Sequence, residues 1–144
     1  MNDKSTDTVH WSFWLVAAFA LLWNVMGSAN YMMQVTSDSL AAFPETHRAI
    51  IESRPGWATG AFAIGVFVGA LGGLLLLLRK SAAYYLFIVS LLGVAVTTVH
   101  TVDVIRSPVE FGVFEVIVMA LMPVLVAAYF IWYAKRAANK GWVS

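Results

Sequence analysis

The feature that most constrains the fold is a set of four long apolar stretches that carry almost no charged side chains. They cover residues 11–35, 56–78, 82–105 and 109–134. A helix needs about 20 residues to cross about 30 Å of hydrocarbon, and each stretch reaches that length. Backbone polar groups in lipid must pair within their own segment, which favours helices over shorter barrel strands. The sequence therefore predicts an all-α integral membrane protein, with four transmembrane helices forming one domain over residues 1–144.

Composition agrees with this class and excludes others. Hydrophobic residues make up 60% of the chain and charged residues 12%, against about 45–50% and about 25% in soluble domains. The net charge of +1 is too balanced for the phosphate neutralisation that nucleic-acid binding requires. The absence of cysteine excludes disulfides and thiolate metal sites. We therefore expect the lipid bilayer, and no nucleic acid, as a partner.

The positions of Lys and Arg predict the orientation of the helices. One set of helix ends carries Lys4, Arg79, Lys80, Lys135, Arg136 and Lys140. The other set carries Arg48, Arg54 and Arg106. Cytoplasmic loops are enriched in basic residues, so both termini are expected in the cytoplasm. The leader, residues 1–10, lacks the basic cluster of a cleavable signal peptide, so we expect the first helix to be retained.

The connections between the spans differ in length. Short loops at 79–81 and 106–108 require neighbouring helices to be antiparallel, which predicts an antiparallel bundle. The first outer loop, 36–54, is longer, and Pro44 within it suits the first turn of a short helix. Residues at roughly helical spacing in this loop are Leu40, Phe43, His47, Ile50 and Ile51. Two interpretations remain open: a short amphipathic helix on the outer surface, or an ordered loop that covers the end of the bundle.

The second span contains glycines four residues apart, at Gly65, Gly69 and Gly73. Small residues at this spacing share one helix face and let another helix approach closely in lipid. The pattern predicts helix packing, either within the bundle or at the interface of a homodimer. The fourth span contains Pro123 at mid-depth, which favours a kink. Kinks serve as gates in some transporters, although most only bend the helix.

Polar side chains inside spans are costly and therefore informative about function. The candidates are Asn24, Gln34, His100, Asp103 and Glu115. Because the helices alternate in direction, all five fall in the outer half of the membrane. If they converge, they form a cavity that binds a ligand or, because histidine titrates near neutral pH, a proton.

Two other interpretations of these residues are open. His100, Asp103 and Glu115 have the donor types of a metal site, but their spacing is unspecific, so we expect no metal. Alternatively, Glu115 forms a hydrogen bond with Asn24 or His100 that only maintains helix register. No catalytic motif occurs, so we expect neither enzymatic activity nor a cofactor.

Several segments of the first three spans resemble a group of small bacterial inner-membrane proteins that are loosely described as sugar transporter-like. The matching segments are Trp23-Asn24-Val25-Met26-Gly27, Tyr31-Met32-Met33-Gln34-Val35, Pro44, Pro55-Gly56-Trp57-Ala58, the glycine-rich second span and Leu77-Leu78-Arg79-Lys80. The resemblance implies the four-helix fold and a location in the bacterial cytoplasmic membrane. It also marks Asn24 and Gln34 as matched polar positions.

These observations lead to two hypotheses about function. The first is a multipass protein that binds or transports a small polar solute, with proton coupling and homodimer formation as options, because known secondary transporters usually combine two repeats. The second is an accessory subunit that packs against a larger membrane complex and has no activity of its own. The two differ in whether the polar residues line a space that water can reach.

Overall fold

The computed structural model describes residues 8–107 and 110–144. Three features discussed above therefore lie outside the described residues: Lys4, Pro108 and the predicted start of the fourth span at 109. Within the described residues the structure is helical, and no strand is present.

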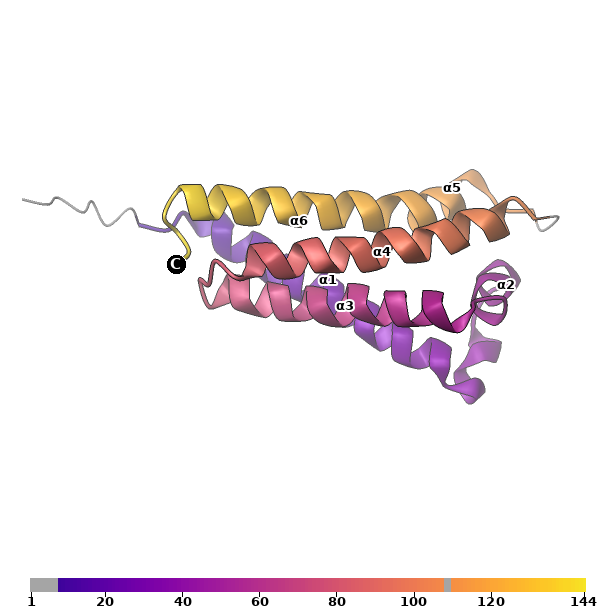
Figure 1. The fold of residues 1–144 in the computed structure, drawn as a ribbon. Helices are drawn as coiled ribbons and strands as arrows, with labels where there is room; N and C mark the ends of the chain where they lie inside the picture. Colours follow the sequence, from indigo (N-terminus) through magenta and orange to yellow (C-terminus); the bar gives the residue numbers. More distant parts are fainter. Residues whose placement is uncertain (1–7, 108–109) are drawn as a thin grey trace, which may run out of the picture.

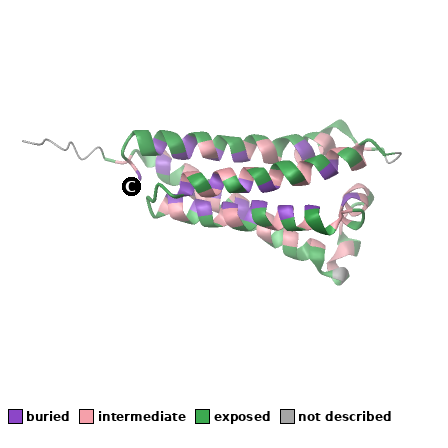
Figure 2. Cartoon of the chain, viewed as in Figure 1, coloured by how far each residue is buried: buried purple, intermediate pink, exposed green. Residues whose placement is uncertain are grey.

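Four helical segments are long and apolar enough to cross a membrane. They are α1 (Trp11–Val35), α3 (Gly56–Leu77), α4 (Ala83–Ile105) and a composite last helix, Val113–Asn139. The four lie side by side as an antiparallel bundle (Figure 1). Buried residues face the centre of the bundle, and exposed residues cover its outside (Figure 2). This arrangement confirms the predicted all-α fold with four candidate transmembrane helices.

The last helix differs from the predicted span. It starts at Val113 and continues to Asn139, beyond residue 134, and it consists of α5 (Val113–Val116), the π-helical segment η2 (Ile117–Leu121) and α6 (Met122–Asn139). The amide of Met122 donates to the carbonyl of Ile117, five residues earlier. Pro123 directly follows this wider turn and lacks the N–H that a regular α-helix requires. The predicted interruption at Pro123 is thus a π-helical turn.

Helix α3 lies at the centre of the bundle, between α1 and α4, and its glycines allow both contacts. A methyl group added to Gly73 would lie 2.7 Å from the Cα atom of Leu21 on α1. One added to Gly65 would lie 3.1 Å from a methyl carbon of Val94 on α4. Gly69 is likewise buried, against side chains of α1 and α4. The glycine face is therefore packed inside the chain, as the first of its two interpretations predicts.

Aromatic side chains pack together at the end of the bundle where α1 begins and α6 ends. Phe13 of α1 is fully buried, and its ring centroid lies 6.5 Å from that of Tyr133 and 6.1 Å from that of Trp142. Gly141, with φ of 69°, ends α6 and turns the chain back. Ser144 then donates its amide to the carbonyl of Arg79, in the α3–α4 connection. These contacts join α1, α6 and the C-terminal segment.

At the opposite end α1 diverges from the other helices, and the first outer loop lies across this end (Figure 1). The loop contains a short 3₁₀ helix, η1 (Ser37–Ala42), and α2 (Glu45–Glu52). Pro44 caps α2, one residue before its first turn. Ile50 of α2 is 5% exposed. The two interpretations of this loop therefore combine: it forms a short helix, and that helix covers the end of the bundle.

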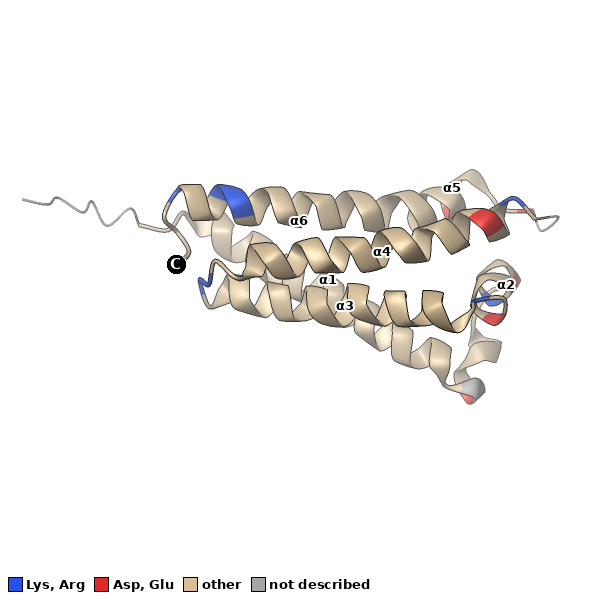
Figure 3. Ribbon diagram, in the orientation of Figure 1, with Lys and Arg blue, Asp and Glu red and all other residues tan. Residues whose placement is uncertain are grey.

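The two ends differ in charge (Figure 3). All the acidic residues that the structure describes lie at the α2 end, and the basic residues of the opposite end are Arg79, Lys80, Lys135, Arg136 and Lys140.

Candidate functional site

A cavity of about 530 Å³ extends from mid-bundle to α2. Its volume falls in the range of about 300–1,000 Å³ that is typical of small-molecule sites. Helices α1, α3 and α4, the last helix and α2 all contribute to its walls. The polar residues that line it are Asn24, Asn30, Gln34, His47, Arg54, Ser90, Thr97, Thr98 and Thr101. A space of this size, lined by both polar and apolar side chains, is suited to binding a small molecule.

The divergence of α1 from α6 creates this space. Phe19 and Phe130 join the two helices, with ring centroids 5.8 Å apart, and Phe130 lines the inner end of the cavity. Beyond this contact α1 diverges from the last helix, whose π-helical turn contributes Met119, followed by Pro123, to the opposite wall. Helix α2 covers the outer end through His47, Ile50 and Ile51. The cavity is therefore closed towards the termini and bounded by α2 at the other end.

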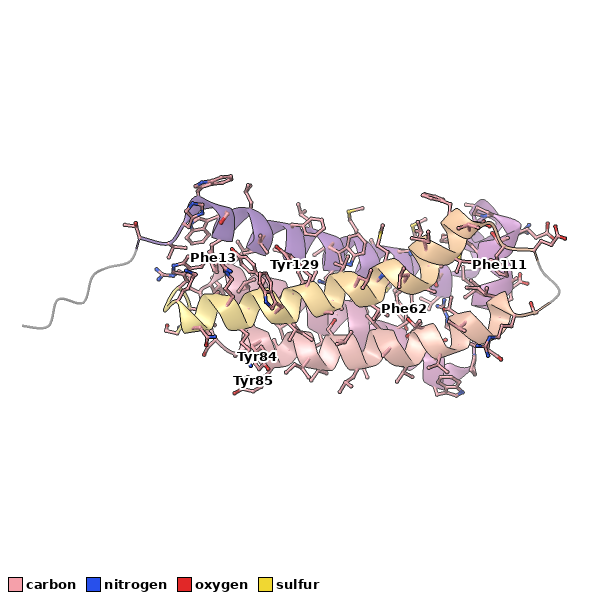
Figure 4. The ribbon with its side chains drawn as sticks, turned by 90° about the horizontal axis from the view of Figure 1, so that it is seen from above. Phe13, Phe62, Tyr84, Tyr85, Phe111 and Tyr129 are labelled. Carbon is pink, nitrogen blue, oxygen red and sulfur yellow. The ribbon has the colours of Figure 1, made fainter. Side chains whose placement is uncertain are left out.

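Arg54 lies in the connection between α2 and α3, and its charged side chain lines the cavity. Its Nη1 atom donates a 2.7 Å hydrogen bond to Oε1 of Gln34, and its guanidinium carbon lies 5.0 Å from the ring centroid of Phe62. Phe62 lies in the half of the bundle nearer α2 (Figure 4). The Nε atom of Arg54 is buried and has no hydrogen-bond partner. Burial lowers the pKa of Arg54, while Tyr31 acts in the opposite direction.

The inner part of the cavity is neutral and hydrogen-bonded within the bundle. Asn24 is buried and donates from Nδ2 to the carbonyl of Ala20, at 2.8 Å. Ser90 of α4 donates its hydroxyl to the carbonyl of Gly65 on α3. The threonines of α4 each donate to a carbonyl four residues earlier, as Thr98 does to Val94 at 2.8 Å. Their oxygen lone pairs remain available to accept hydrogen bonds from a solute.

The structure places the five predicted site residues in different environments. Asn24 and Gln34 line the cavity. His100 is buried outside the set of lining residues, with Nε2 3.2 Å from the carbonyl oxygen of Ser53. Asp103 is exposed.

Glu115 is not in the cavity wall either, because it caps a helix. Its carboxylate accepts a 2.7 Å hydrogen bond from the Thr46 hydroxyl and a 2.9 Å hydrogen bond from the amide of Gly112. The predicted hydrogen bond between Glu115 and Asn24 or His100 is therefore wrong. His100, Asp103 and Glu115 do not come together, and residues 8–107 and 110–144 contain no group of three such side chains that could hold a metal ion.

Sequence reasoning missed several residues of the cavity wall. Arg54 was counted only among the basic residues that predict helix orientation. An arginine next to Pro55, at the start of a span, nevertheless lies where its side chain can reach into the bundle. The polar face of α4 was missed as well. Thr97, Thr98 and Thr101 follow Ser90 by seven, eight and eleven residues, which places all four on one side of a helix.

The fold and the cavity define this chain as a multipass α-helical membrane protein with a partly polar internal site. Searches against protein families, curated proteins and solved structures found no match. The resemblance to sugar transporter-like proteins therefore stays a prediction.

Proposed function

We propose that this protein binds a small polar solute in the cavity and carries it across the membrane. The observation that carries the proposal is the 530 Å³ cavity, which places side chains from four helices and α2 around one space. An accessory subunit has no need of such a space. The cavity wall contains amide and hydroxyl groups, which form hydrogen bonds with polar solutes. The proposal includes no catalytic step.

We place the protein in the bacterial cytoplasmic membrane with both described chain ends in the cytoplasm. The asymmetry of charge between the two ends supports this orientation, because basic residues favour the cytoplasmic side. In this orientation the closed end faces the cytoplasm and α2 faces outward. His100 and Glu115 are bonded outside the cavity, so the proposal includes no proton-coupled step through them.

The last helix is proposed to be the part of the cavity wall that moves during transport. Its π-helical segment and Pro123 lie beside the cavity, and π-helical turns occur frequently at functional sites. Rotation of α6 about this turn would separate Phe130 from Phe19 and open the inner end. If a second copy is needed, it must pack through a face other than the glycines of α3.

The absence of cysteine from the chain makes water access directly measurable. Thr98→Cys places a thiol in the cavity wall, and Leu92→Cys places one on the same helix at a site that is 61% exposed on the outer face of the bundle. A hydrophilic, membrane-impermeant maleimide should label Thr98→Cys in intact spheroplasts. It should leave Leu92→Cys unlabelled, because the lipid tails exclude the reagent there.

The side of labelling distinguishes binding from transport. Labelling of Thr98→Cys from outside and also in inverted vesicles indicates alternating access, as transport requires. Labelling from outside only restricts the function to binding. If the thiol of a folded Thr98→Cys protein reacts from neither side, water does not reach the cavity and the proposal fails.

A further inference from the structure

The electrostatics of Arg54 narrow the class of solute. Its guanidinium is largely removed from water, and the neutral oxygen of Gln34 is its hydrogen-bond acceptor. No carboxylate of the described residues contributes to the pKa of Arg54. A buried charge without an opposite charge is unfavourable, and the residues of the cavity wall leave this cation incompletely compensated. A second nitrogen, Nδ1 of His47, is also buried in the same wall without a hydrogen-bond partner.

We propose that the cavity binds an organic anion, with a carboxylate or phosphate group at Arg54 and an apolar body directed towards mid-bundle. This inference rests on the proposed function and specifies its substrate class. The planar guanidinium matches the two oxygens of a carboxylate or phosphate, and such charge-assisted hydrogen bonds are about twice as strong as neutral ones. The buried Nδ1 of His47, which has no hydrogen-bond partner, supplies a second polar contact for this group.

The rest of the wall supports an apolar body for this ligand. The deeper lining residues include the side chains of Trp23, Val66, Val94 and Phe130, and they bear no charge. A metal cation would be repelled by Arg54, and the cavity wall contains no carboxylate to coordinate it. A neutral sugar would leave the charge of Arg54 uncompensated. An anion with an apolar ring or chain complements both the charge of Arg54 and the apolar side chains deeper in the cavity.

Two sources provide this chemistry. One is a water-soluble organic acid that enters past α2. The other is the headgroup of an anionic lipid that enters between α1 and the last helix, where Met26 both lines the cavity and is 69% exposed on the outside. The two sources share the anionic group at Arg54, and the choice of bilayer distinguishes them.

The test compares two probes of the same shape on the full chain in phosphatidylcholine nanodiscs. The probes are 4-(trifluoromethyl)benzoate and the neutral 4-(trifluoromethyl)benzamide, and fluorine NMR measures the affinity of each. We expect the benzoate to bind at least about tenfold more tightly, since a hydrogen bond to a charged group contributes at least that factor. This comparison uses the unmodified protein and needs no variant to fold.

Variants then locate the anion. Arg54→Gln should reduce benzoate affinity to the level of the amide, and Arg54→Lys should retain part of the preference because it keeps the charge without the planar fork. Arg106→Gln is the matched control, because Arg106 is exposed at the same end of the bundle and does not line the cavity. Far-UV circular dichroism confirms that each variant is folded.

The outcomes separate this inference from the proposed function. Equal binding of the two probes overturns the anion preference and leaves solute binding intact. Binding of neither probe overturns the inference, while the labelling of Thr98→Cys decides the proposed function separately. Unchanged benzoate affinity in folded Arg54→Gln also overturns the inference, because the anion then lies elsewhere. If adding phosphatidylglycerol to the nanodisc weakens benzoate binding in competition, the anion site accepts lipid headgroups; if it has no effect, the site accepts the soluble acid.

Discussion

The contact between α3 and α4 gives the most direct prediction about stability. At Gly93 the two backbones meet: a Cβ atom added there would lie 2.6 Å from the carbonyl oxygen of Ala61 and 2.7 Å from the amide nitrogen of Gly65. Both are backbone atoms, so a change of side-chain rotamer cannot relieve the overlap. Gly93→Ala must therefore separate the two helices at their crossing point.

The magnitude follows from two opposing terms. Overpacking a well-packed site costs about 1–3 kcal/mol. Replacing glycine by alanine within a helix contributes about 1 kcal/mol in the stabilising direction. Gly60→Ala on α3 is the matched control, because a Cβ there meets no atom within 4 Å and only the stabilising term applies. The free energy of unfolding of Gly93→Ala should therefore lie about 1–3 kcal/mol below that of Gly60→Ala.

Reversible unfolding in mixed micelles with increasing sodium dodecyl sulfate, followed by far-UV circular dichroism, measures these free energies. The wild-type protein, Gly60→Ala and Gly93→Ala are compared under the same conditions. Equal stability of the two variants would refute the reasoning, because it would show that the backbones of α3 and α4 do not meet at Gly93. A stabilised Gly93→Ala would refute it more strongly.

Three further predictions concern other contacts. Ser90→Ala removes the hydroxyl that donates to Gly65, and in the same unfolding assay it should cost about 0.6 kcal/mol, the average for hydrogen bonds between membrane helices; a gain in stability would contradict this. Glu115→Ala removes the acceptor of Thr46 and Gly112, so hydrogen exchange in α2 should become faster while that of α4 is unchanged, and equal rates in α2 would argue against the contact. A fluorescent protein fused after Ser144 should fluoresce in bacteria, and alkaline phosphatase fused there should be inactive; the reverse pattern would place the C-terminus outside.

The close contacts in this bundle also explain the position of the cavity. Glycines and small side chains hold α3 against α1 and α4, and aromatic rings hold α1 against α6 near the termini. Helices whose side chains are in contact at one end and that diverge at the other enclose a space between them. Helix α2, tied to the last helix by the hydrogen bond from Thr46 to Glu115, bounds that space.

The number of spanning helices and the approximate limits of the first three followed from the sequence, because crossing a bilayer depends on a local property, the run of apolar residues. The observed limits of α1, α3 and α4 lie within one residue of the predicted spans. The close packing at Gly65, Gly69 and Gly73 was also local, since four-residue spacing places small residues on one helix face. The sequence left open whether that face packs within the chain or against a second copy.

Only the tertiary structure decided which residues line the cavity. Outside its glycine face α3 is apolar all round, so its sequence carries no amphipathic signal that tells which of its other side chains line the cavity. Whether Asn24 faces Glu115 depends on the rotation and tilt of two separate helices, and Glu115 instead caps a helix that starts at Val113. Arg54 reaches the cavity because α1 diverges and α2 covers the end of the bundle. Sequence periodicity describes single segments, whereas a shared site depends on how those segments are placed against one another.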